Sequence, residues 1–104
     1  MFKQAVLTKS EIISFLRANK AILHEQFRVN EIGLFGSFAR DEANEKSDID
    51  FLVVIDDDVV NYREIKSALK TFLVKHFGRE VDLANPQSLK PHFKNRILSQ
   101  AVYA

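Results

Sequence analysis

The sequence contains no cysteine and no long run of hydrophobic residues. The lack of cysteine excludes disulfides and thiolate metal sites, and it fits a reducing compartment. No segment approaches the ~20 apolar residues that a membrane-spanning helix needs. Residues 1–7 also lack the apolar stretch of a signal peptide. We therefore expect a cytoplasmic protein that does not contact a membrane.

The chain also has almost no excess charge of either sign. Its 15 Lys and Arg residues against 14 Asp and Glu residues give a formal net charge of +1. This balance offers no general electrostatic reason to bind nucleic acid, so no direct nucleic-acid contact is expected. Repeats, linkers and low-complexity segments are absent as well. A length of 104 residues then suits a single domain over residues 1–104, with one modest core.

The apolar residues that are present alternate between helical and strand spacing. Thr8 and Ser10 are both candidate N-caps for the first helix, Gly78 suits the end of a long helix, and Pro91 suits the start of the last one. Helical spacing covers residues 9–26, 37–42, 61–77 and the segment from 91 onwards. Strand composition covers residues 29–35, 48–55 and 80–84.

This order of elements predicts an α/β (α+β) fold with a small mixed sheet flanked by helices. The order of the strands in the sheet is not fixed by the sequence. The tail, residues 102–104, is apolar and can pack either on its own domain or on a partner.

The most informative segment joins a Gly-Ser turn to an Asp-x-Asp pair. Gly36 lets the backbone approach a ligand closely, and Ser37 at a helix start offers donors to a phosphate. Asp48 and Asp50 are alternate residues of a strand, so their Cα atoms lie roughly 6–7 Å apart on one face. Two carboxylates about 4 Å apart repel by about 4 kcal/mol at an effective dielectric of 20, which favours a bound cation. Oxygen ligands point to Mg²⁺ or Mn²⁺ rather than zinc.

Further charged residues extend this pattern. Asp82 lies in a short strand that could neighbour the first pair and complete a triad for two metal ions. Arg40 lies one helical turn after Ser37 and could reach a phosphate, or could instead pair with a nearby acid such as Glu42. Each feature also has a structural interpretation: Asp48-x-Asp50 as a hydrated strand entry, Asp82 as a strand-end residue, and the Gly-Ser pair as an ordinary turn. The acidic run 56–58 is interpreted as a hydrated strand end.

The run Gly-Ser-Phe-Ala-Arg (36–40) followed by Ser-Asp-Ile-Asp-Phe-Leu-Val (47–53) resembles the signature of the minimal nucleotidyltransferase (MNT) family, in the DNA polymerase β-like superfamily. The resemblance extends over most of the chain and implies the fold of that family. It implies that Gly36 and Ser37 hold a triphosphate. It also implies that Asp48, Asp50 and Asp82 bind two Mg²⁺ ions, with Asp82 helping to activate the attacking hydroxyl.

The resemblance further implies a biological role. MNT proteins are commonly encoded beside a HEPN-domain ribonuclease toxin, and the resemblance implies an antitoxin that transfers AMP from ATP to a tyrosine of that toxin. We therefore expect a hetero-complex with such a toxin, and a homodimer is a further option. Two positions depart from the family pattern: Asp41 replaces a frequent glycine, which bears on the shape of the loop, and Phe51 replaces a usual leucine.

Two other functions compete with this expectation. The chain could be the catalytic subunit of an enzyme that nucleotidylates a small molecule, such as an aminoglycoside. Alternatively, it could neutralise a toxin by binding alone, without catalysis. The presence of all three acids argues against a degraded catalytic site.

Overall fold

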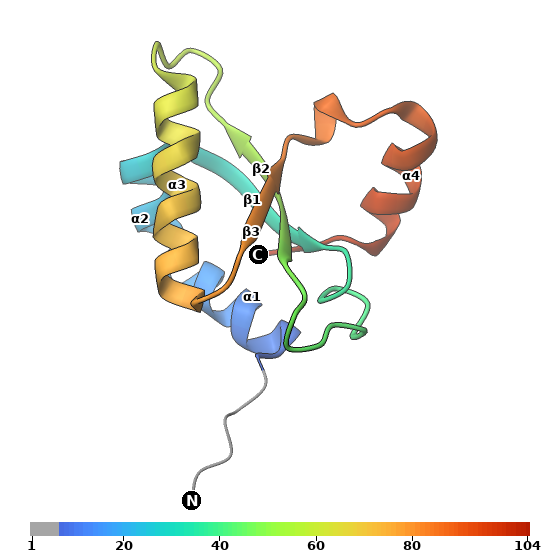
Figure 1. The fold of residues 1–104 in the computed structure, drawn as a ribbon. Coiled ribbons are helices and arrows are strands. Elements are labelled where there is room, and N and C mark those ends of the chain that lie inside the picture. The colour runs from blue at the N-terminus through green and yellow to red at the C-terminus, as the bar shows by residue number, and fades with distance from the viewer. Residues whose placement is uncertain (1–6) are drawn as a thin grey trace, which may run out of the picture.

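A four-stranded sheet in the order β3-β2-β1-β4 forms the centre of the computed structural model, which describes residues 7–104 (Figure 1). Strand β1 (Val29–Phe35) runs antiparallel to both β2 (Ile49–Ile55) and β4 (Val102–Tyr103). Strand β3 (Val81–Ala84) runs parallel to β2. The expectation of a small mixed sheet is therefore confirmed.

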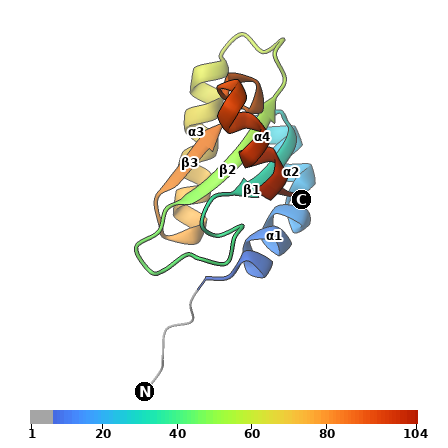
Figure 2. The same cartoon turned by 90° about the vertical axis from the view of Figure 1, so that its right-hand side faces the viewer.

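The helices lie on both faces of this sheet. Helices α1 (Lys9–Ala18), α2 (Lys20–Phe27) and α3 (Tyr62–Phe77) cover one face, and α4 (Pro91–Gln100) lies on the other (Figure 1 and Figure 2). A short 3₁₀ helix, η1 (Pro86–Ser88), leads from β3 towards α4. Because α4 has no buried residue, this second face is covered more thinly than the first.

The hydrophobic core lies between the sheet and helices α1, α2 and α3. Phe51 of β2 is fully buried, and its ring lies 6.2 Å from that of Phe77 in α3. The ring of Phe15 in α1 also packs against Phe77, at 5.1 Å. Each fully buried side chain of this size contributes roughly 1.5–3 kcal/mol. Successive residues of a strand point to opposite faces, so Asp50, which is adjacent to Phe51, faces away from this core.

The first helical segment differs from its expected form. It was expected as one helix, but the structure divides it at Asn19, whose φ of −111° and ψ of 17° are not helical. The side-chain amide of Asn19 donates to the carbonyl of Phe15 at 2.9 Å, which competes with continuation of the helix. Thr8 rather than Ser10 is the N-cap, in a capping box with Glu11.

The other expected ends are close to those observed. Gly78 ends α3 with a φ of 67°, and Pro91 is the first residue of α4. The tail pairs with the edge of the sheet: Gly33 is opposite Tyr103, whose ring lies over it. None of the helices described in residues 7–104 is long and apolar enough to cross a membrane. The expectation about a signal peptide concerns residues 1–7, most of which lie outside the described part.

Candidate functional site

Gly36 follows β1 and brings the backbone against the carboxylate of Asp50. Its φ is 76°, in the left-handed region that favours glycine. A Cβ atom added at Gly36 would lie 3.0 Å from Cγ of Asp50 and closer still to Oδ2. Phe35 and Asp50 are paired across the two strands, which fixes this approach. The predicted proximity of the glycine turn and the acidic pair is therefore present.

The segment after Gly36 is a set of turns, so the expectation of a short helix over 37–42 is wrong. The amide of Arg40 donates to the carbonyl of Gly36 at 3.1 Å, and the amide of Glu42 donates to that of Ser37 at 2.9 Å. Asp41 has a φ of 59°, a left-handed conformation that cannot continue a right-handed helix. Phe38 is buried, which anchors the turns to the core.

The φ of Asp41 explains why glycine suits this position. Aspartate tolerates the left-handed region better than most residues because its short side chain can form local polar contacts. Here its carboxylate also accepts from Nζ of Lys9 at 3.2 Å, and the same Nζ donates to the carbonyl of Ala39 at 3.4 Å. The loop shape is thus kept without the glycine, and the substitution alone does not indicate a degraded site.

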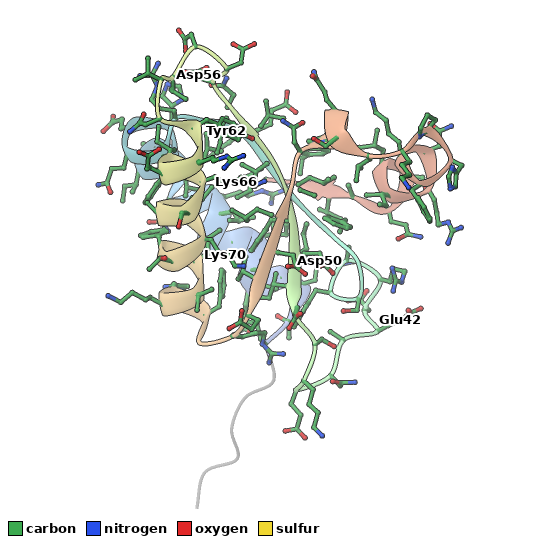
Figure 3. All side chains as sticks on the ribbon, turned by 45° about the horizontal axis from the view of Figure 1, so that its top comes forward. Glu42, Asp50, Asp56, Tyr62, Lys66 and Lys70 are labelled. Atoms are coloured by element: carbon green, nitrogen blue, oxygen red, sulfur yellow. The ribbon has the colours of Figure 1, made fainter. Side chains whose placement is uncertain are left out.

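Asp50 and Asp82 are direct neighbours across the parallel pair β2 and β3. Partial burial of Asp50, together with the nearby charges of Asp82 and Asp48, raises its pKa to about 6, and the guanidinium of Arg40 opposes this rise. The structure thus brings the three predicted acids into one electrostatic neighbourhood. Figure 3 shows Asp50 on β2, with Glu42 in the adjoining turns.

The three carboxylates do not form a preassembled metal cage. Within residues 7–104, no three His, Cys, Asp or Glu side chains are close enough together to hold a metal ion. Like charges without a counter-ion repel one another, and Asp48 and Asp82 are exposed and able to turn away. The donor set still fits Mg²⁺, because it consists of oxygen atoms only and includes a carboxylate that is destabilised when charged. Asp48 and Asp82 would have to turn towards Asp50 for the three carboxylates to ligate one ion.

Arg40 makes contacts within the protein. Its Nε donates to Oε1 of Glu42 at 2.9 Å, and its Nη1 donates to Oε1 of Gln100 at 3.2 Å, at the end of α4. The pairing with Glu42 is one of the two alternatives that the sequence left open. Arg40 would have to exchange these partners to bind a phosphate, although its effect on Asp50 shows that it is close to the site.

Arg79 is a residue of the site that the sequence did not single out. Its Nη1 donates to the carbonyls of Asn44 at 3.1 Å and Ser47 at 2.8 Å, immediately before Asp48. Its guanidinium carbon also lies 5.2 Å from the ring centre of Phe38, in the turns after Gly36. One side chain therefore links the two segments that carry the predicted phosphate and metal residues. Contacts to backbone carbonyls leave no motif, so no sequence signal could have identified it.

A large cavity opens beside Asp48. It has a volume of about 590 Å³ and is lined by residues that include Glu45, Ser47, Asp48, Phe77 and Arg79. This volume lies in the range of small-molecule sites. Of the three predicted acids, only Asp48 lines this cavity, and Asp50 and Asp82 do not.

Comparisons with known proteins agree on the family and on the fold. The model of the family described as nucleotidyltransferase domain matches residues 16–104. The chain is 41% identical over 104 residues to the protein adenylyltransferase MntA of Thermococcus cleftensis, covering 95% of this chain and 98% of that one. A solved minimal nucleotidyltransferase has the same fold, with a TM-score of 0.76 at 24% identity over 95% of this chain and 98% of that one. A toxin–antitoxin crystal structure with AMP-PNP is similar with a TM-score of 0.62 at 26% identity, over 93% of this chain and 72% of that one.

Proposed function

Because this chain belongs to the nucleotidyltransferase domain family, we propose that it is an antitoxin that transfers AMP from ATP to a tyrosine hydroxyl of a HEPN-domain ribonuclease toxin. The close approach of Gly36 to Asp50, with Asp82 in register beside it, is the observation that carries this proposal. The similarity to an adenylyltransferase and to a toxin–antitoxin complex with a nucleotide analogue supports the donor and the partner.

In this mechanism the turn and the acids have separate tasks. Gly36 and Ser37 would hold the triphosphate, because a glycine backbone admits phosphate oxygens that a side chain would exclude. Asp48, Asp50 and Asp82 would hold Mg²⁺, which would supply charge neutralisation at the triphosphate when bound. The tyrosine oxygen attacks the α-phosphorus, pyrophosphate leaves, and Asp82 takes the hydroxyl proton. Positioning and fixed charges supply most of the rate enhancement.

Different observations argue against each of the two competing functions. A small-molecule acceptor is less well supported, because the 41%-identical relative is described as a protein adenylyltransferase. An antitoxin that acts by binding alone would not need the left-handed Gly36 turn to meet a carboxylate of raised pKa. We further propose a cytoplasmic location and a hetero-complex with the toxin, while a homodimer stays a prediction.

The test is the intact mass of the HEPN partner after incubation with this protein, ATP and Mg²⁺. We expect a gain of whole AMP units, and no gain with a variant that carries Asp48→Ala and Asp50→Ala. A stable complex of the wild-type protein with an unmodified partner would instead establish an antitoxin that acts by binding. Cell protection by the double variant, at wild-type level, would also show that modification is not required.

A further inference from the structure

Helix α4 presents a line of three residues that the rest of the fold does not bury. Phe93, Ile97 and Gln100 are spaced at i, i+4 and i+7, which places them along one side of the helix. Phe93 is 44% exposed and Ile97 is half-buried, although both are large apolar residues. Figure 1 shows α4 on the opposite side of the sheet from α1, α2 and α3, so the helices of the core lie away from it. We name these three residues the α4 line.

The α4 line ends at the candidate site. Oε1 of Gln100 accepts from Nη1 of Arg40 at 3.2 Å, and Arg40 lies close to Asp50. Because Asp50 faces away from the core, it lies on the same face of the sheet as α4. A rise of ~1.5 Å per helical residue places Phe93 about 10 Å from Gln100 along the helix axis. A protein seated on the α4 line would therefore lie beside the acidic group.

The segment that contains α4 differs in charge from the rest of the chain. Residues 83–104 contain no Asp or Glu and three basic residues, Lys90, Lys94 and Arg96, whereas the whole chain has a net charge of only +1. None of the ion pairs found within residues 7–104 includes any of the three. Lys90 and Arg96 are exposed and lie three residues before and three residues after Phe93. Positive charge therefore borders the exposed ring of Phe93.

These basic residues do not stabilise α4 itself. A helix dipole disfavours cations near the N-terminus and favours acids there, yet α4 starts with Lys90 and Lys94 and has no acid in its first turn. The side chain of Lys90, at the N-cap, forms no capping hydrogen bond. Acidic residues of a partner would offset this arrangement. A symmetric pairing of two α4 helices would not, because it brings like charges together.

The combination of an aromatic residue with surrounding charge is typical of a protein interface. Aromatic residues and Arg are enriched in interface cores, and a few such anchors carry much of the binding energy. The spacing i, i+4 and i+7 is also that of a helix that lies in an apolar groove of its partner. The low net charge of the whole chain argues against a nucleic acid as the ligand.

Resting on the proposed function, we propose that the α4 line is the surface on which the acceptor protein docks. The ring of Phe93 enters an apolar groove of the acceptor, and acidic residues at the rim of that groove pair with Lys90 and Arg96. The acceptor is thereby held on the face of the sheet that carries Asp50.

A binding measurement without ATP tests the apolar part of this surface. The proposed HEPN partner is titrated with the full chain by calorimetry. We expect Phe93→Ala to bind about thirty-fold more weakly, as is usual for the loss of an aromatic anchor. The control Ile22→Ala removes an apolar residue of similar exposure, 39%, from α2 and should bind within about two-fold of wild type. Because neither residue is buried, thermal melts should show that both variants are folded.

A second pair of variants tests whether the partner is acidic. Lys90→Gln/Arg96→Gln should bind about five-fold more weakly at about 0.05 M salt, and the difference should shrink at about 0.5 M salt because salt screens exposed charges. The control Arg17→Gln/Lys20→Gln removes the same charge from α1 and α2 and should bind as wild type does. Equal losses in the two double variants would show that only the net charge matters and would contradict docking at α4.

Four other results would overturn the proposal. Two concern the partner: wild-type protein that does not bind it, and Phe93→Ala that binds it as tightly as wild type does. The third is self-association of the chain in place of partner binding, lost in Phe93→Ala, which would mark an interface between two copies. The fourth is binding of a single-stranded oligoadenylate that Lys90→Gln/Arg96→Gln abolishes, which would mark a nucleic-acid site.

AMP transfer to the proposed HEPN partner separates this inference from the proposed function. Phe93→Ala should raise KM for the partner about thirty-fold and leave kcat and KM for ATP unchanged, because docking takes place outside the nucleotide site. An increase in KM for ATP would contradict an acceptor surface. If wild-type protein transfers AMP and Phe93→Ala docks normally, the inference fails and the proposed function stands. If the partner docks through Phe93 but receives no AMP, the proposed function fails and the docking surface stands.

Discussion

At the scale of single residues, Asp50 shows how the site opposes the stability of the fold. Its carboxyl is partly buried and faces two other acids, so its pKa in the folded protein is about 6 instead of the ordinary 3.8. The folded state therefore holds this proton more tightly than the unfolded state does. The contribution of Asp50 to stability is therefore greatest below about pH 4, falls as the pH rises towards 6, and is level above that.

Asp50→Asn should consequently stabilise the protein at neutral pH while abolishing AMP transfer. A shift of about 2 pKa units corresponds to about 3 kcal/mol, and partial exposure reduces the expected gain to about 1–2 kcal/mol. Urea unfolding at pH 7.5 in EDTA measures this gain, which should disappear near pH 4. The exposed Asp57→Asn serves as control. A gain at pH 4 as large as at pH 7.5 would show that the partly buried charge of Asp50 is not the cause.

Asp41 is a second residue whose backbone conformation determines the outcome of substitution. Replacement by glycine relieves a left-handed strain of about 1 kcal/mol but loses an exposed ion pair with Lys9 worth about 0.2–1 kcal/mol. Asp41→Gly should therefore change stability by less than about 1 kcal/mol, whereas Asp41→Ala loses the ion pair and keeps the strain, and should destabilise by about 0.2–1 kcal/mol. Urea unfolding of the two variants side by side decides this. Equal stabilities would mean that the φ of Asp41 carries no strain.

At the scale of elements, the site depends on how the loops around the sheet are held together. Arg79 follows the end of α3 and binds the loop before β2 and the turns after β1. Regular hydrogen bonding fixes the strands themselves, but these two loops contain few such bonds. The guanidinium of Arg79 therefore fixes the two loops, as backbone hydrogen bonds fix the strands.

Arg79→Ala should loosen residues 44–48 and lower kcat for AMP transfer by about ten-fold or more, because misplacement of ligating groups is costly to the chemistry. The lost hydrogen bonds and cation–π contact should reduce the free energy of unfolding by about 1–3 kcal/mol. Hydrogen exchange measures the loop, and steady-state kinetics measures kcat. Arg17→Ala, exposed on α1, is the matched control. Faster exchange at residues 44–48 with an unchanged kcat would show that Arg79 does not position the site for catalysis.

Elements with strong local signals could be predicted from the sequence. Gly78 and Pro91 gave the end of α3 and the start of α4, and the strands β1 and β2 were placed to within one residue. The break at Asn19 and the turns after Gly36 could not be predicted. They depend on a side-chain bond to a carbonyl and on the conformation of Asp41, and neither disturbs the apolar periodicity.

At the scale of the whole molecule, strand order assembles the site. Asp48 and Asp50 are close in sequence, but Asp82 reaches them only because β3 pairs in parallel with β2, with α3 as the crossover. The sequence supplied the third acid as a candidate and left its strand unplaced. The arrangement also leaves β3 at the edge of the sheet.

In the proposed mechanism, the Gly36 turn and the three carboxylates catalyse nucleotidyl transfer. The most direct test incubates the protein and the proposed HEPN partner with Mg²⁺ and ATP labelled at either the α- or the γ-phosphate. We predict that label from the α-phosphate becomes covalently attached to the partner and that label from the γ-phosphate leaves in pyrophosphate. Attachment of the γ-label, or of neither label in a complex that forms normally, would contradict it.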